Sequence, residues 1–538
     1  MIVSGKWGGF FANLGAILLG ALLFAGAFPN PLAADGIPIL GWVAFVPPFW
    51  VIRRASAGAS IFWGALYGYT AYGLFNYWLS VFHPLAGIIV GLIYLTYFAL
   101  LFPLLKLAVI LFPKRGYILQ WLIWIAYEYL RTQGFLGYPY GISGYSQWSV
   151  LPLIQIASIF GVWGVSALVV FPSAYAAAAL GSDIPVKKAA LGDFIKREKF
   201  PGLAWLAALI AALIFGLVSP VDYSREPAAR IALVQHNTDP WRGDLSDFRK
   251  NYRVLKRLSE EALAGEPKPD LVVWSETAFV PRIYWHVTYR DDQDSYILIR
   301  ELLDFLAAQD VPFVIGNDDA RKEISERGIW DRVDYNAALL FHRGEIKDIY
   351  RKLRLVPFTE YFPYEKQFPR IYKVLDEADT HFWKQGEEAT VFEINGLKFS
   401  SPICFEDTFG YLSREFVRNG AEIIENLCND AWSNSLPAQA QHAAMAVFRA
   451  VENRRSMVRA TASGQTCAVD PNGKILAMAE PFTEAQLTVD VPVVTQDTPY
   501  TKFGDIWAQG FTAAAGIILI LGVALGIINK PKIPRGKP

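Results

Sequence analysis

Hydrophobic residues are concentrated towards the two ends of this 538-residue chain. Long apolar stretches fill residues 1–220 and return near the C-terminus, whereas residues 222–501 alternate short apolar runs with polar segments, as soluble domains do. A helix that crosses a membrane needs ~20 mostly apolar residues. By this measure we predict spans at residues 9–28, 37–52, 58–80, 85–111, 117–131, 150–180, 202–219 and 509–528. The pattern predicts an α-helical polytopic membrane domain over 1–220 with seven spans, a second domain over 221–505, and a last span with a basic tail over 506–538.

The loops between these spans differ in charge. One alternating set carries Lys6, Arg53, Arg54, Lys114, Arg115, Lys187, Lys188, Lys196, Arg197, Lys199, Lys530, Lys532, Arg535 and Lys537. In the other set, Arg131 is the single basic residue. Because cytoplasmic loops are enriched in lysine and arginine, we expect both termini in the cytoplasm and residues 222–501 on the opposite face of the membrane.

The loops expected outside the cytoplasm are rich in aromatic residues, glycine and proline, as in "NYWLSVFHP" (76–84) and "GYPYGISGYSQW" (137–148). Such residues form an interfacial belt in many membrane proteins, and they would also suit a lipid-binding mouth. Glu128 and Arg131 lie three residues apart in "EYLR", on one helical face. Charges at this depth either pair structurally or serve function, and the sequence leaves both choices open.

The region between the apolar ends alternates strands and helices. Apolar, β-branched runs predict strands at residues 230–238, 270–277, 311–319, 336–342, 398–406 and 422–430. Apolar residues spaced three and four apart predict helices at 245–263, 293–309 and 440–455. This alternation is typical of an α/β or α+β layer structure. Glu276, Cys404, Asn429 and Asp430 follow predicted strands, and strand ends are where open sheets place their sites.

Charge and cysteine content limit the classes of function that fit this chain. The chain has 50 basic and 50 acidic residues, so its net charge gives no indication of a nucleic-acid partner. Three cysteines are too few for a disulfide framework. We interpret Cys428 and Cys467 as buried apolar residues, with a disulfide left as the alternative outside the cytoplasm. The spacing of histidines and cysteines predicts neither a metal site nor a cofactor.

Three of the polar residues fit one kind of chemistry. Acyl transfer through a cysteine needs a thiolate, a base that generates it, and a cation or N–H donors for the oxyanion. Cys404 in "PICFED", Glu276 in "VVWSETA" and Lys352 in "YRKLRLVPFTE" supply these three types. Taken singly, each has an ordinary explanation, because buried cysteines are often apolar filler and charged residues often cap strands or face solvent.

The order of these motifs, "WSETA", "RKLRLVPFTE" and "ICFED", resembles the nitrilase superfamily of carbon–nitrogen hydrolases. Apolar spans before and after the domain, "NDAW" at 429–432 and "GYSQ" at 144–147 make the chain similar to the apolipoprotein N-acyltransferases within that superfamily. The resemblance implies an α/β nitrilase-like αββα sandwich for residues 221–505. The residue after the nucleophile is commonly tyrosine in the family and is Phe405 here, which preserves the backbone N–H but removes a hydroxyl.

The resemblance also implies roles. Glu276 would be the base, Lys352 and the Phe405 N–H would hold the oxyanion, and Cys404 would carry the acyl group. Further implied residues are Glu360 and Glu406 as supports of the site and Trp241, Tyr145 and Trp432 as substrate contacts. The implied substrates are a phospholipid acyl donor and the α-amine of a diacylglyceryl-modified apolipoprotein.

The implied setting is the bacterial cytoplasmic (inner) membrane, with a monomeric, multi-pass protein, its catalytic domain on the periplasmic face, and no nucleic-acid partner. Two other functions remain open. A membrane-tethered amidase would share the three catalytic residues but would need only one span as an anchor. A transporter with a soluble sensing domain would need polar residues throughout its spans, and these spans carry few charges.

Overall fold

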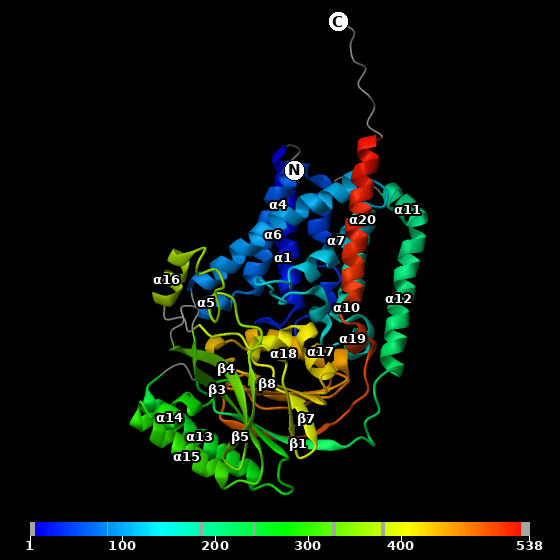
Figure 1. The fold of residues 1–538 in the computed structure, drawn as a ribbon. Helices are drawn as coiled ribbons and strands as arrows, with labels where there is room; N and C mark the ends of the chain where they lie inside the picture. Colours follow the sequence, from blue (N-terminus) through cyan, green and yellow to red (C-terminus); the bar gives the residue numbers. More distant parts are fainter. Residues whose placement is uncertain are drawn as a thin grey trace. The chain divides into compact units, whose positions relative to one another are not determined.

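The computed structural model describes residues 6–82, 84–181, 188–239, 243–324, 330–377 and 382–528. The chain divides into two compact units (Figure 1). Unit 1 consists of Met1–Val218 and Asp505–Pro538, and unit 2 consists of Ser219–Gly504. Each unit has its own architecture.

Unit 1 is helical. Its helices are α1 (Lys6–Ala27), α2 (Pro38–Gly41), α3 (Val46–Arg54), α4 (Ala57–Phe75), α5 (Leu79–Phe82), α6 (Pro84–Leu111), α7 (Gly116–Leu130), η1 (Ser143–Gln147), α8 (Leu151–Ile154), α9 (Ala157–Phe160), α10 (Val162–Leu180), α11 (Lys188–Arg197), α12 (Lys199–Val218) and α20 (Ile506–Ile528). Within the described residues, five segments are long and apolar enough to cross a membrane: Trp7–Ala27, Ala86–Leu111, Val162–Leu180, Lys199–Val218 and Ile506–Gly526.

The structure differs from the sequence prediction at two of the expected spans. Residues 37–52 form two short helices rather than one, because Pro47 and Pro48 lack the amide hydrogens that would continue a helix across this segment. Residues 150–180 are interrupted at Gly161, whose φ of +63° ends α9 before α10 begins. The eight-span count therefore stays a prediction.

Two glycines allow α4 and α6 to pack closely in unit 1. A Cβ atom at Gly64 would lie 2.1 Å from the carbonyl oxygen of Phe98, and one at Gly68 would lie 2.2 Å from that of Tyr94. No side-chain carbon atom fits at such a separation. The small residues thus permit backbone contact, which is how helices associate where hydrophobic burial offers little driving force.

Unit 2 contains two six-stranded sheets. The first has the order β12 (Ala485–Pro492), β1 (Ala228–Gln235), β2 (Leu271–Trp274), β3 (Phe313–Ile324), β4 (Trp330–His342), β5 (Glu345–Arg351). The second has the order β11 (Ile475–Met478), β10 (Cys467–Val469), β9 (Ser456–Thr461), β8 (Ile423–Cys428), β7 (Leu397–Ser400), β6 (Val391–Ile394). The strands β1, β2 and β3 run parallel, as do β7, β8 and β9.

Helices cover the outer face of each sheet. α13 (Leu245–Leu263), α14 (Ile283–Tyr289) and α15 (Gln293–Ala307) contact the first sheet, and α17 (Gly410–Arg418) and α18 (Leu436–Asn453) contact the second. The sheets contact each other through β1, β2 and β12 of the first sheet and β9, β10 and β11 of the second. Unit 2 is therefore the predicted αββα sandwich. Short helices α16 (Pro369–Glu377) and α19 (Pro499–Phe503) and the single turns η2 (Cys404–Thr408) and η3 (Ala431–Ser433) complete it.

The strand β2 is buried on both of its faces. Val272 and Trp274 belong to the apolar core between the first sheet and its helices, and the alternating residues point to the second sheet. The indole N–H of Trp274 donates to Ser259 Oγ on α13 at 2.9 Å. This bond fixes the end of β2 two residues before Glu276.

Candidate active site

Glu276 lies in the turn that follows β2 and is almost fully buried. Its Oε1 accepts hydrogen bonds from Asn336 Nδ2 at 2.9 Å and Lys352 Nζ at 3.2 Å. Its Oε2 accepts from the backbone N–H of Asn429 at 3.0 Å. Asn429 follows β8 of the second sheet, so this one carboxylate links the carboxyl ends of strands from both sheets.

Lys352 follows β5 and is only 1% exposed. Its ammonium group lies between two carboxylates, 3.2 Å from Glu276 Oε1 and 2.8 Å from Glu360 Oε1. Burial by itself lowers the pKa of a lysine, but Glu276, Glu360 and the Cys404 sulfur together raise the pKa of Lys352 well above its ordinary value. Lys352 is therefore a fixed cation beside the thiol.

Cys404 begins the turn η2 and has a φ of +50°, in the left-handed region that non-glycine residues seldom adopt. Such backbone conformations are frequent at functional sites, where the conformational strain is part of the mechanism. The predicted strand 398–406 is shorter in the structure: β7 ends at Ser400, and the chain stays extended to Ile403, which forms a bridge with Leu427 beside β8. Cys404 is partly exposed, as an attacking thiol must be.

Glu406 connects η2, the turn that begins with Cys404 (the cysteine turn), to the backbone that follows Lys352. Its Oε2 accepts from the Ile403 N–H at 2.7 Å, and its Oε1 accepts from the N–H groups of Leu353 and Arg354 at 2.7 and 2.8 Å. The hydroxyl of Tyr350 lies 2.8 Å from both carboxylate oxygens. Burial raises the pKa of Glu406 to about 7 against the opposing effect of these donors. This carboxylate therefore positions Lys352 relative to Cys404.

The remaining predicted residues lie in different places. Glu360 pairs with Lys352 and accepts from the Val356 N–H at 2.9 Å; burial raises the pKa of this carboxyl despite the lysine. Phe405 is the second residue of η2, and Trp432 is in η3. Tyr145 is buried in η1 of unit 1. Trp241 lies outside the described residues.

Asn336 and Tyr350 are not among the residues predicted from the sequence, although Asn336 donates to Glu276 and Tyr350 donates to Glu406. Asn336 lies within β4, and Tyr350 lies within β5. Asn336 begins the strand predicted at 336–342, and Tyr350 begins the motif "YRKLRLVPFTE", but no local signal indicates the contact that either side chain makes. The sequence indicates that Asn429 follows a strand and belongs to "NDAW", but its backbone bond to Glu276 depends on a contact across 153 residues.

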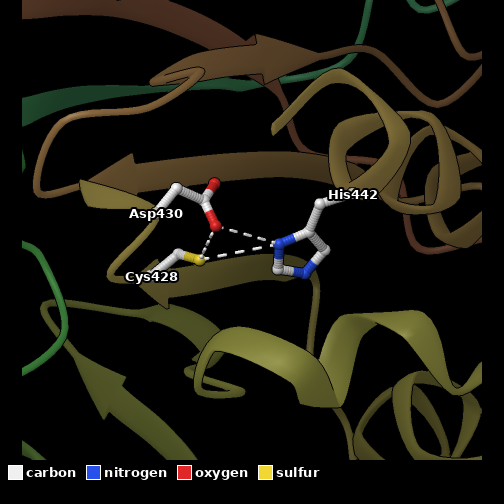
Figure 2. Close-up of side chains that lie close together, drawn as sticks. All are labelled: Cys428, Asp430 and His442. Atoms are coloured by element: carbon white, nitrogen blue, oxygen red, sulfur yellow. Dashed lines mark hydrogen bonds and ion pairs between the residues drawn. The ribbon is translucent and has the colours of Figure 1, made fainter. Parts of the chain in front are cut away.

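A second polar cluster lies beside the cysteine turn (Figure 2). Cys428 Sγ lies 3.1 Å from Asp430 Oδ1 and 3.8 Å from His442 Nδ1, and the latter two atoms lie 3.2 Å apart. These separations would fit ligands of one metal ion. The three groups also hydrogen-bond to one another, and burial raises the pKa of the Cys428 thiol, which a metal would have to bind as the thiolate.

His442 is held as a cation in this cluster. Its Nε2 lies 2.7 Å from Asp407 Oδ1, and its Nδ1 faces Asp430. Burial lowers the pKa of His442, but Asp407 and Asp430 outweigh burial and raise it to about 10. The buried guanidinium of Arg459 contacts both carboxylates as well. The two cations neutralise the two carboxylates. We therefore interpret the cluster as a structural ion network.

Comparison with known proteins identifies the family. The carbon–nitrogen hydrolase family model matches residues 230–500, and the model of the apolipoprotein N-acyltransferase N-terminal domain matches residues 19–175. Apolipoprotein N-acyltransferase 1 of Treponema denticola is 46% identical over 97% of both chains, and the protein of the same name from Treponema pallidum is 47% identical over 98% of both. This chain belongs to the apolipoprotein N-acyltransferase family.

Relatives with lower identity carry the same family name. The apolipoprotein N-acyltransferase of Borreliella burgdorferi is 31% identical over 89% of this chain and 90% of its own length. Among solved structures, an amidase of the nitrilase superfamily from Nesterenkonia is 20% identical with a TM-score of 0.36, covering 52% of this chain and 94% of the amidase. In this chain an apolar helical region accompanies the nitrilase-like domain.

Proposed function

We propose that this enzyme transfers an acyl chain from a phospholipid to the α-amine of the diacylglyceryl-modified N-terminal cysteine of an apolipoprotein, through a thioester on Cys404. One observation supports this most directly. The buried Lys352, which follows β5, lies between the carboxylates of Glu276 and Glu360, and Glu406 ties the loop after Lys352 to the turn that begins with Cys404. This arrangement contains a base, a fixed cation and a partly exposed thiol.

In the first half-reaction, Glu276 takes the proton of the Cys404 thiol. The Lys352 cation favours the thiolate because opposite charges a few ångströms apart stabilise each other in a buried site. The thiolate attacks the ester carbonyl of the phospholipid, and Lys352 Nζ with the Phe405 N–H stabilises the oxyanion. The intermediate collapses, and Glu276 gives its proton to the departing lysophospholipid oxygen.

In the second half-reaction, the α-amine of the lipidated cysteine attacks the thioester carbonyl. Glu276 takes the proton that the amine loses. The Cys404 thiolate leaves and later regains its proton from Glu276, so the enzyme returns to its starting state. The products are an amide on the apolipoprotein and a free thiol on the enzyme.

The setting follows from the substrates, since both are embedded in lipid. We place the enzyme in the bacterial inner membrane with the catalytic domain on the periplasmic face, as the basic loops predict. Trp241, Tyr145 and Trp432 are the proposed substrate contacts. Labelling of an exposed single-cysteine variant such as Glu260→Cys in intact cells would test the orientation, because protection of that site would contradict it.

Intact-mass analysis tests the thioester. Full-length enzyme incubated with phosphatidylethanolamine vesicles should gain the mass of one acyl chain, and neutral hydroxylamine should remove it. The adduct should be absent from Cys404→Ala and retained in Cys467→Ala, whose buried thiol serves as the matched control. An adduct that persists in Cys404→Ala, or one that resists hydroxylamine in the wild type, would overturn the mechanism.

The same experiment separates acyl transfer from amide hydrolysis. The acylated enzyme should pass its acyl group to a diacylglyceryl-modified peptide and return to its original mass. An amidase would instead release ammonia from small amides and would give no lipid-derived adduct. Hydrolysis of small amides without a phospholipid-derived adduct would favour the tethered amidase.

A further inference from the structure

The nucleophile has a second cysteine as its neighbour across the sheet. Strands β7 and β8 run parallel, with Phe399 paired to Ile423 and Ser400 to Ile424. The pairing resumes at the bridge between Ile403 and Leu427. One residue beyond this bridge lie Cys404, where the chain turns into η2, and Cys428, the last residue of β8.

This register meets the first requirement of a disulfide. Neighbouring strands lie about 4.8 Å apart, and disulfides join residues whose Cα atoms are about 4.4 to 6.8 Å apart. The side-chain amide of Asn426 keeps the two segments together, because it donates to the carbonyl oxygens of Pro402 at 3.1 Å and Cys404 at 3.2 Å.

Cys428 interacts with the Cys404 thiol and with the polar groups around it. Its pKa is raised well above the ordinary value by burial first, then by the Cys404 thiol and the Asp430 carboxylate. Its Sγ donates to Asp430 Oδ1 at 3.1 Å. Figure 2 shows Cys428 at the end of its strand with Asp430 and His442 around the sulfur. The acyl-transfer steps use none of these contacts.

The two thiols differ in access. Cys404 is partly exposed, whereas Cys428 is completely buried. A small oxidant in solution therefore meets Cys404 first. The third cysteine, Cys467, is paired with Arg459 and Met478 on its neighbouring strands and has no cysteine partner in this register.

We propose that Cys428 is a resolving cysteine, which closes a reversible disulfide with Cys404 when a hydroperoxide oxidises the nucleophile. The Cys404 thiolate attacks the peroxide, forms an S–O bond and releases water or an alcohol, which leaves a sulfenic acid. The Cys428 sulfur then attacks the Cys404 sulfur, and hydroxide leaves with the Cys428 proton as water. Each sulfur loses one electron, and the peroxide gains two.

The disulfide would stop acyl transfer and protect the enzyme. Without a resolving thiol, a sulfenic acid is oxidised further to sulfinic acid, which thiols do not reduce. With Cys428 in place, oxidation stops at a bond that a dithiol reduces by exchange. The inference does not depend on the identity of the acyl substrates, because its readouts are thiol state and mass.

Hydrogen peroxide with the purified full-length protein tests this proposal. The wild type should lose ~2 Da, the mass of two hydrogen atoms, together with two maleimide-reactive thiols after denaturation. Proteolysis should yield one cross-linked peptide that joins Cys404 to Cys428, and dithiothreitol should restore both thiols. These measurements need no variant, so a folding defect cannot obscure them.

Two matched variants complete the test. In Cys428→Ser, peroxide should add ~32 Da to Cys404 as sulfinic acid, and dithiothreitol should no longer restore the thiol. Cys467→Ser should behave as the wild type. Accumulation of sulfinic acid in the wild type at the rate seen in Cys428→Ser, or a cross-link that involves Cys467, would overturn the proposal.

Discussion

Two buried ion clusters lie near the cysteine turn of unit 2, and they differ in their balance of charge. The first, the Lys352 cluster, contains the carboxylates of Glu276 and Glu360 around the single cation of Lys352, the residues that we propose to be catalytic. The structural cluster contains the carboxylates of Asp407 and Asp430 around two cations, His442 and Arg459. The clusters share η2, because Cys404 begins this turn and Asp407 lies within it.

The difference explains what each cluster can do. In the structural cluster, both imidazole nitrogens and the guanidinium face carboxylates, so every charge has a partner. In the Lys352 cluster, two carboxylates share one cation, so we propose that one of them accepts the proton of the Cys404 thiol. A buried charge is costly unless it is paired, so the excess carboxylate indicates function, whereas the balanced network indicates a fixed framework.

Removal of the excess carboxylate should give the largest effect. Glu276→Gln cannot accept a proton, so we expect acyl-adduct formation to slow about 10³-fold, within the range for a lost general base. The free energy of unfolding should change little because Lys352 keeps its ion pair with Glu360. The measurement is the rate of adduct formation by intact mass. We take about threefold as the margin of the assay. A rate closer than that to the wild-type rate would show that Glu276 is not the base.

Removal of a cation from the structural cluster should affect folding instead. Arg459→Met leaves two buried carboxylates with one cation, and we expect the free energy of unfolding of unit 2 to fall by about 3–5 kcal/mol. Denaturant unfolding measures this change. Arg257→Met is the control, because its partners Glu261 and Glu484 are half exposed and such pairs contribute about 1 kcal/mol or less. Equal losses in the two variants would contradict the comparison.

The structural cluster should also make stability depend on pH. The pKa of His442 is raised to about 10 in the folded state, whereas an unfolded histidine titrates near ~6.5. The contribution of charged His442 to the free energy of unfolding is therefore complete below about pH 6.5 and is lost as the pH rises through about 10. We expect unfolding free energy to fall by about 2 kcal/mol between about pH 7 and pH 9.

The matched variant for this titration is His442→Gln, which should be less stable at neutral pH and should lack this part of the pH dependence. Thermal unfolding at several pH values measures both curves. Parallel curves for the wild type and the variant would show that His442 is not the titrating group.

The smallest effect is expected at a buried carboxyl that belongs to neither cluster. Glu425 on β8 is fully buried; burial raises its pKa well above the ordinary value, although Ser401 donates to it at 3.2 Å. Such a group favours folding less as pH rises above its unfolded pKa. Glu425→Gln should therefore leave the unfolding free energy at neutral pH unchanged or raise it by about 1 kcal/mol, with normal adduct formation. A loss of the adduct would place Glu425 in the site.

Local sequence pattern is sufficient to predict several parts of this protein. The helix predicted at 245–263 begins and ends at those residues, since its apolar spacing is regular and Asp244 caps it with Asp247. Glu276 and Cys404 were recognisable because each follows an apolar run within a family motif. The αββα sandwich followed from that resemblance.

Tertiary structure decided the rest, because the deciding contacts join residues that are distant in the chain. β9 was missed because its buried Arg459 breaks the apolar pattern and is tolerated only beside Asp407, 52 residues away. Asn336 reaches Glu276 across 60 residues, and Tyr350 reaches Glu406 across 56. The alignment of Cys404 with Cys428 depends on strand register, which is set by hydrogen bonds between β7 and β8 and leaves no mark in either segment alone.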